Sequence, residues 1–215
     1  MGEVMRLEGI KAAFLGDSIT EGYGLSNPEK VYYKILAEKT SMETYGYGLG
    51  GTRITRDKNE VGERRDFLFR AEFMEKADLI VVFGGTNDYG LNSPLRKDAA
   101  DEYTFEGACR ALFEKLQKIY SGSAIVVMTP LHRSDETFSR ENTERSTQPK
   151  LEDYVNCLRK IAGDFSLPVV DLYRKANIFP VMEDHRRLYC PDGLHPNEAG
   201  HEIIASVLWK ELLKL

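Results

Sequence analysis

The stretch Ile10-Lys11-Ala12-Ala13-Phe14-Leu15-Gly16-Asp17-Ser18-Ile19-Thr20 decides the fold of this chain. Its apolar part, Ile10 to Leu15, ends at a Gly-Asp-Ser turn, and the glycine-bearing turn Gly22-Tyr23-Gly24 follows. A short apolar run bounded by turn residues is typical of a buried strand. Open α/β sheets bind their ligands at the carboxyl ends of such strands. The sequence therefore predicts that Ser18 lies where a nucleophile is expected.

Beyond this stretch, strand and helix patterns alternate along the chain. The predicted strands are short and rich in β-branched or aromatic residues; they are Ile10–Leu15, Glu43–Tyr47, Leu79–Phe83, Ala124–Met128 and Pro168–Leu172. Amphipathic helical patterns separate them, and a last helix begins at about Pro196, which we place in its first turn. Strands joined through helices require right-handed crossovers in a mainly parallel sheet. We predict an α/β fold, a three-layer α/β/α sandwich with about five strands.

Length and charge limit the possible functions. The 215 residues are 42% hydrophobic and show no break in composition, which favours a single domain over residues 1–215. The net charge is −5, from 34 acidic and 29 basic side chains. Such a mild acidic excess argues against nucleic acid or an anionic membrane as a partner.

The first residues, the apolar runs and the cysteines indicate a cellular compartment. The first eight residues are too few and too charged for a secretory signal, and no apolar run reaches the length of a membrane span. The three cysteines, Cys109, Cys157 and Cys190, are odd in number and lack metal-ligand spacing, which favours reduced thiols. We therefore expect a cytoplasmic protein.

Three further motifs accompany the Gly-Asp-Ser turn. Gly48-Leu49-Gly50-Gly51-Thr52 and Gly84-Gly85-Thr86-Asn87-Asp88 each follow a predicted strand, and Asp192-Gly193-Leu194-His195-Pro196 lies near the end. In this order, over Gly16 to His195, the four motifs resemble those of the SGNH (GDSL-type) hydrolase family. The resemblance implies a flavodoxin-like sandwich and an ester hydrolase that needs no cofactor and no metal. It also implies roles for single residues: Ser18 as nucleophile, His195 as base, Asp192 as the residue that orients it, and Ser18, Gly51 and Asn87 as oxyanion donors.

The residue types suit these roles. A serine hydroxyl is a weak nucleophile at neutral pH and needs a base such as His195, which Asp192 can orient from the same turn. The amide of Gly51 can approach a substrate closely, and Asn87 offers a side-chain NH₂. We expect Asp17 and Asp88 to hold the turns by bonding backbone groups.

Each motif alone has a simpler interpretation as a turn or a helix cap. A metal cluster of Asp192, His195 and His201 is conceivable, but the spacing differs from the i, i+4 pattern of metal-binding helices. His132 and His185 fall in polar segments, where we expect solvated side chains. Four motifs in one order at one sheet edge favour catalysis over these interpretations.

The loops bear on the substrate, which we expect to be a small-molecule ester. Residues 52–66 and 131–150 follow strands and are expected to form walls or a lid, with Arg53 close enough to Gly51 to bind substrate. Because no long apolar loop is present, a small acyl group is favoured, with acetyl on a sugar as the preferred example. Acyl transfer to an acceptor other than water and a non-catalytic binding module remain alternatives. The sequence does not indicate the oligomeric state.

Overall fold

A computed structural model describes residues 7–57, 65–96, 101–136 and 148–215. Within these ranges the centre is a five-stranded sheet in the order β2-β1-β3-β4-β5, and every neighbouring pair is parallel. The strands are β1 (Lys11–Gly16), β2 (Glu43–Gly48), β3 (Leu79–Phe83), β4 (Ala124–Met128) and β5 (Val169–Val170). The predicted α/β class with a mainly parallel sheet is therefore confirmed.

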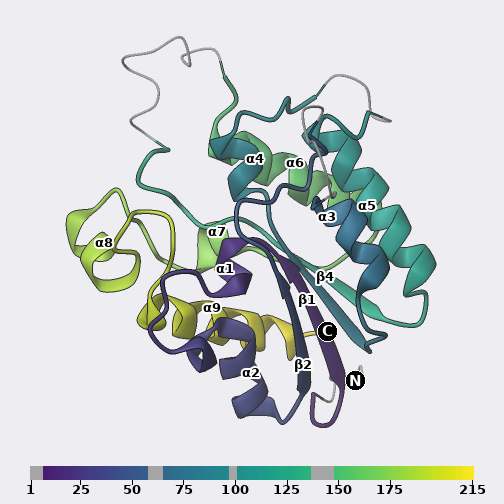
Figure 1. Cartoon of the computed structure of the whole chain (residues 1–215), viewed down its shortest axis with the longest axis horizontal. Coiled ribbons are helices and arrows are strands. Elements are labelled where there is room, and N and C mark those ends of the chain that lie inside the picture. Colours follow the sequence, from purple (N-terminus) through teal and green to yellow (C-terminus); the bar gives the residue numbers. More distant parts are fainter. Residues whose placement is uncertain (1–6, 58–64, 97–100, 137–147) are drawn as a thin grey trace.

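Helices cover both faces of the sheet (Figure 1). One layer contains α3 (Phe67–Arg70), the 3₁₀ helix η2 (Ala71–Phe73), α5 (Phe105–Ile119) and α6 (Leu151–Asp164). The opposite layer contains α2 (Tyr32–Thr40) and α9 (Glu198–Leu212), which pack against each other. Shorter helices lie in the connections: α1 (Ser18–Glu21), η1 (Pro28–Lys30), α4 (Thr86–Gly90), α7 (Leu172–Lys175) and α8 (Glu183–Tyr189).

The core lies on both faces of the central strands. Alternate residues of β1 point to opposite layers, so Ala13 and Leu15 pack with α5 and α6 while Ala12 and Phe14 pack with α2 and α9. All four side chains are fully buried. Burial on both faces explains why the sequences of the central strands are continuous apolar runs.

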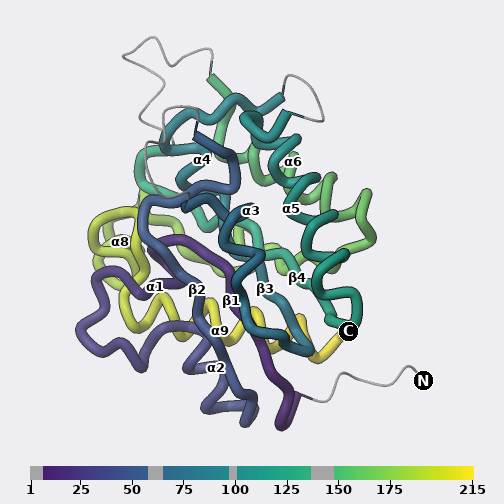
Figure 2. The backbone as a smooth tube through the Cα atoms, turned by 45° about the vertical axis from the view of Figure 1, so that its right-hand side comes forward, coloured from purple at the N-terminus to yellow at the C-terminus, as the bar shows by residue number. Residues whose placement is uncertain are grey.

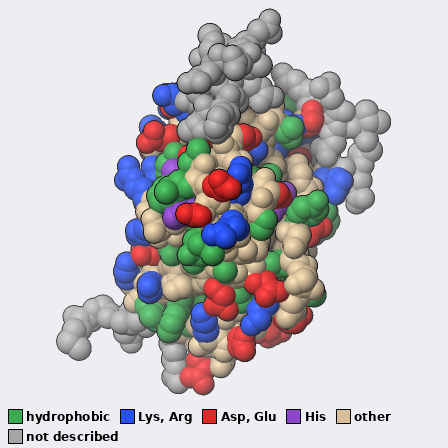
Figure 3. Space-filling view, turned by 90° about the vertical axis from the view of Figure 1, so that its left-hand side faces the viewer, with side chains coloured by type: hydrophobic (Ala, Val, Ile, Leu, Met, Phe, Trp, Pro, Cys, Tyr) green, Lys and Arg blue, Asp and Glu red, His purple; other side chains and the backbone are tan. Residues whose placement is uncertain are grey.

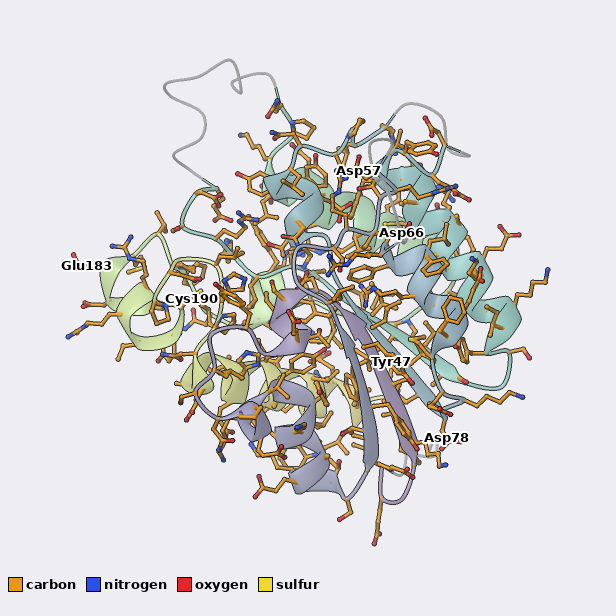
Figure 4. The ribbon with its side chains drawn as sticks, in the orientation of Figure 1. Tyr47, Asp57, Asp66, Asp78, Glu183 and Cys190 are labelled. Atoms are coloured by element: carbon orange, nitrogen blue, oxygen red, sulfur yellow. The ribbon has the colours of Figure 1, made fainter. Side chains whose placement is uncertain are left out.

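The carboxyl ends of the parallel strands meet at one edge, from which the tube in Figure 2 leads into α1 and α4. Figure 4 shows Asp57 and Asp66 on this side of the sheet, whereas Asp78 lies at the opposite end of the strands. Motifs far apart in sequence therefore converge at this edge, as the sequence predicted.

The bounds of β1 and β2 differ from the prediction by one residue at one or both ends, and two other boundaries differ because of side-chain caps. β5 includes only Val169 and Val170, because the Asp171 side chain accepts a hydrogen bond from the Arg174 amide and begins α7 at Leu172. Pro196 lies before α9 rather than in its first turn, because the Asn197 side chain caps that helix by accepting from the Gly200 amide at 3.1 Å. No helix in the described ranges has the length and apolar character needed to span a membrane.

Candidate active site

The side chains of Ser18, His195 and Asp192 form one hydrogen-bonded chain. Ser18 begins α1 directly after β1, and its Oγ lies 2.9 Å from Nε2 of His195. The other ring nitrogen, Nδ1, lies 2.6 Å from Oδ2 of Asp192. The imidazole therefore faces the hydroxyl with one nitrogen and the carboxylate with the other, which is the arrangement that base activation of a serine requires.

Backbone contacts fix the turn that carries Asp192 and His195. Oδ1 of Asp192 accepts the amides of Leu194 at 2.9 Å and His195 at 2.7 Å. Partial burial alone would raise the pKa of Asp192, but the hydrogen bonds from the amide and ring of His195 and from the Leu194 amide outweigh it and hold the pKa below its usual value. Asp192 therefore stays ionised and can stabilise a protonated imidazole.

The loops after β2 and β3 face each other beside Ser18. Gly51 adopts a left-handed conformation with φ +72°, which only glycine adopts without strain. Nδ2 of Asn87 donates one hydrogen to the Thr52 carbonyl at 2.9 Å, which leaves its second hydrogen for another acceptor. A Cβ on Gly50 would lie 3.8 Å from the Ser18 Cβ, so this loop passes close to the nucleophile.

Two buried aspartates hold the turns at this edge of the sheet. Asp17 caps α1 by accepting the Ile19 amide at 2.9 Å, as predicted, and burial raises its pKa to about 7. Asp88 also bonds backbone, but in a different loop. It accepts the amides of Ile54 at 3.0 Å and Thr55 at 2.9 Å, and also the Thr55 hydroxyl. Burial raises the pKa of Asp88, which these hydrogen bonds partly oppose. Asp88 thus ties the Asn87 motif to the Gly51 loop.

Arg70 is a further organising residue that the sequence prediction missed. From the end of α3 its guanidinium donates to the carbonyls of Tyr47 at 2.5 Å and Gly16 at 2.9 Å and to the Thr52 hydroxyl at 2.9 Å. Burial lowers its pKa to about 10. One side chain therefore joins the carboxyl ends of β1 and β2 to the Gly51 loop. Its sequence neighbours Phe69 and Ala71 are apolar, and nothing in this short segment gave a signal of the role.

A hollow of about 180 Å³ adjoins Gly50 and Gly51. Arg53 lines it, as do Thr52, Thr55, Asp66 and the exposed Leu91. The Arg53 guanidinium pairs with Asp57 at 2.5 Å and lies 3.4 Å from the Ser93 hydroxyl. Arg53 thus lies beside Gly51 as expected, with its charge already matched by Asp57. Parts of both predicted wall loops, residues 58–64 and 137–147, lie outside the described residues.

The other histidines do not join this cluster. The His201 ring is fully buried, its Nδ1 accepts the Tyr32 amide at 3.2 Å, and burial lowers its pKa to about 4. The expectation of a solvated His132 was wrong, because its ring packs 3.8 Å from the Tyr173 ring and its Nδ1 lies 2.7 Å from Glu136.

His185 is likewise not a free loop residue. It lies in α8, and its Nδ1 accepts the Phe179 amide at 3.3 Å. Among the residues with described positions, no group of three or more His, Cys, Asp or Glu side chains is arranged to hold a metal ion. The three cysteines are buried and unpaired.

Comparison with known proteins places this geometry in a family. The model of the GDSL-like lipase/acylhydrolase family matches residues 14–203, which include all four motifs. The chain therefore belongs to the GDSL-like lipase/acylhydrolase family, and the predicted resemblance is confirmed.

Individual relatives are distant. An acetylxylan esterase of Xylanibacter ruminicola is 22% identical over 94% of this chain, and the chain spans about two fifths (42%) of that protein. The crystal structure of a protein from Lactobacillus plantarum is 28% identical, with a TM-score of 0.82 over 95% of this chain and 97% of the other. The crystal structure of an acetyl xylan esterase, AlAXEase, shares the fold with a TM-score of 0.67, at 21% identity and 94% and 98% coverage.

Proposed function

We propose that this protein hydrolyses a small acyl ester through an acyl-enzyme on Ser18. The observation that carries the proposal is the continuous hydrogen-bonded chain from the Ser18 hydroxyl through His195 to Asp192. Two donor loops lie beside it, at Gly51 and Asn87.

The reaction follows from these positions. His195 Nε2 takes the proton of the Ser18 hydroxyl while Oγ bonds to the ester carbonyl carbon. The carbonyl oxygen becomes negative and is stabilised by the amides of Ser18 and Gly51 and by the second hydrogen of Asn87 Nδ2; one such donor contributes roughly 3 to 4 kcal/mol. The bond to the alcohol then breaks, and the alcohol leaves with the proton from His195. Water repeats the sequence and releases the carboxylic acid and free Ser18.

The hollow beside Gly51 supports a short acyl group. Its volume of about 180 Å³ is small, and charged or polar side chains line most of it. An apolar groove of about 610 Å³, lined by residues such as Leu49, Phe69 and Phe73, lies on the outer side of β2. The distant likeness to acetylxylan esterases favours an acetylated carbohydrate. A preference for C12 or longer esters over acetyl esters would reject the small acyl group and point to the apolar groove.

The test of the nucleophile needs no assumption about the substrate. A fluorophosphonate reacts with an activated serine by forming a P–O bond and releasing fluoride, so intact-mass analysis should show one adduct. Ser18→Ala should show none, and it should abolish turnover of p-nitrophenyl acetate. Equal turnover by both proteins would end the proposal. Acceleration by an added alcohol, with formation of a new ester, would instead identify an acyltransferase.

A further inference from the structure

Tyr23 lies against the catalytic imidazole from the end of α1. The centroids of the Tyr23 and His195 rings are 4.5 Å apart, with an interplanar angle of 47°. Gly22 and Gly24 on either side have φ values of +86° and +81°, and the Tyr23 amide donates to the Ser18 carbonyl at 2.9 Å. Tyr23 is 58% exposed. A large exposed aromatic side chain thus borders the candidate active site.

The position of Tyr23 relates it to one part of the substrate. In the proposed reaction His195 Nε2 returns the proton to the departing alcohol, so the alcohol oxygen must come within hydrogen-bonding reach of that atom. The oxyanion donors Gly51 and Asn87 lie on other loops, after β2 and β3. A side chain that contacts the His195 ring therefore borders the alcohol portion of the ester rather than the acyl group.

The chemistry of the exposed ring indicates what kind of alcohol it would bind. A tyrosine ring offers an apolar face and a polar hydroxyl, which together suit a partner with an apolar face and polar edges. A pyranose has this character, because its axial C–H groups form an apolar face and its hydroxyls lie at the edge. Figure 3 shows the side of the molecule that carries α1 and α8, where histidine side chains reach the surface among hydrophobic and acidic groups.

We propose that the exposed ring of Tyr23, held against His195, is the platform on which the pyranose ring of the leaving alcohol stacks. This inference rests on the proposed function and names the class of its leaving group. It predicts that Tyr23 contributes to binding of esters whose alcohol is a sugar ring, and contributes little when the alcohol is too small to cover the phenol face.

Two acetyl esters with different alcohols test the platform. The probes are ethyl acetate and the mono-O-acetylated methyl β-xylopyranosides, and the readouts are kcat and KM measured separately. Tyr23→Ala should raise KM for the pyranosides about fivefold to tenfold, the scale of one lost ring contact. It should leave kcat/KM for ethyl acetate within about twofold of the wild type, and Tyr23→Phe should keep most of the pyranoside binding. Leu213→Ala, which truncates an exposed apolar side chain at the end of α9, should change the kinetics of neither ester.

Several results would overturn the proposal that Tyr23 is a stacking platform. Equal losses of kcat for both esters in Tyr23→Ala would mean that the ring only orients His195, and unchanged kinetics for both would mean that it binds nothing. Hydrolysis of ethyl acetate by the wild type without saturable hydrolysis of any pyranoside would also reject it. Failure of the proposed function is recognised separately, because turnover of ethyl acetate would then persist in Ser18→Ala.

Discussion

Replacement of Asp88 by alanine should loosen the candidate oxyanion loops and lower stability together. The carboxylate accepts two backbone amides, those of Ile54 and Thr55, and the Thr55 hydroxyl. That hydroxyl also lies 2.7 Å from the Ser93 hydroxyl, so it keeps a partner in the variant. The two buried amides would have no hydrogen-bond partner in the variant. At roughly 1 to 3 kcal/mol for each unsatisfied donor, the free energy of unfolding should fall by about 2 to 6 kcal/mol.

Activity should fall with stability because Asn87 precedes Asp88 and the tethered loop contains Gly51. We expect kcat for p-nitrophenyl acetate to fall about 10- to 100-fold with little change in KM, which is less than the complete loss of one oxyanion donor would cause. Urea unfolding and steady-state kinetics measure the two effects. Thr55→Val is the matched control, because it keeps both amide bonds to Asp88 and should cost only about 1 kcal/mol. An Asp88→Ala protein within about 1 kcal/mol of the wild type, with unchanged kcat, would refute the tether.

Three further substitutions test other parts of the structure. Because burial lowers the pKa of His201 from 6.5 to about 4, the unfolded chain binds a proton that the folded chain excludes. This contribution to stability is fully present above pH 6.5 and should fall by about 2 kcal/mol at about pH 5. Urea unfolding should show a smaller pH dependence in His201→Asn than in the wild type, and identical pH dependence would contradict the burial of a neutral ring. Arg70→Met removes the donors to two strand-end carbonyls and should lower the free energy of unfolding by about 2 to 4 kcal/mol. Arg70→Lys should restore only part of this loss. Full stability in Arg70→Met would contradict the role of Arg70 in joining the strand ends. Asp192→Asn should lower kcat about 10³- to 10⁴-fold with little effect on KM, and a loss below about tenfold would remove Asp192 from the proposed mechanism.

The central strands β3 and β4 were predictable because both of their faces are buried. Leu79–Phe83 and Ala124–Met128 were predicted with the bounds that the structure has, since continuous apolar runs ended by polar or glycine residues leave little choice of boundary. The last strand was predicted too long, because apolar Leu172 continues the run in sequence while the Asp171 side chain begins a helix there. A side-chain cap of this kind outweighs the apolar pattern at the end of an element.

The candidate site was predictable in its motifs but not in the contacts that join them. Asp192 and His195 share one turn, so their contact follows from sequence proximity. The bond from Asp88 to Ile54 joins residues 34 positions apart, and Arg70 reaches Gly16 across 54 positions. Such pairs depend on how loops from different strands meet, which no local pattern contains. Tyr23 was predicted only to be part of a turn, because its contact with His195 also arises from tertiary structure.

The central claim is that the Ser18 hydroxyl and the His195 imidazole, 2.9 Å apart, act as one unit. A double-mutant cycle on kcat tests it most directly, with Ser18→Ala, His195→Ala and the double variant assayed on one acetyl ester. If the two groups share a single proton-transfer step, the double variant should be about as slow as either single variant. Losses that multiply, so that the double variant is far slower than either single one, would contradict the account.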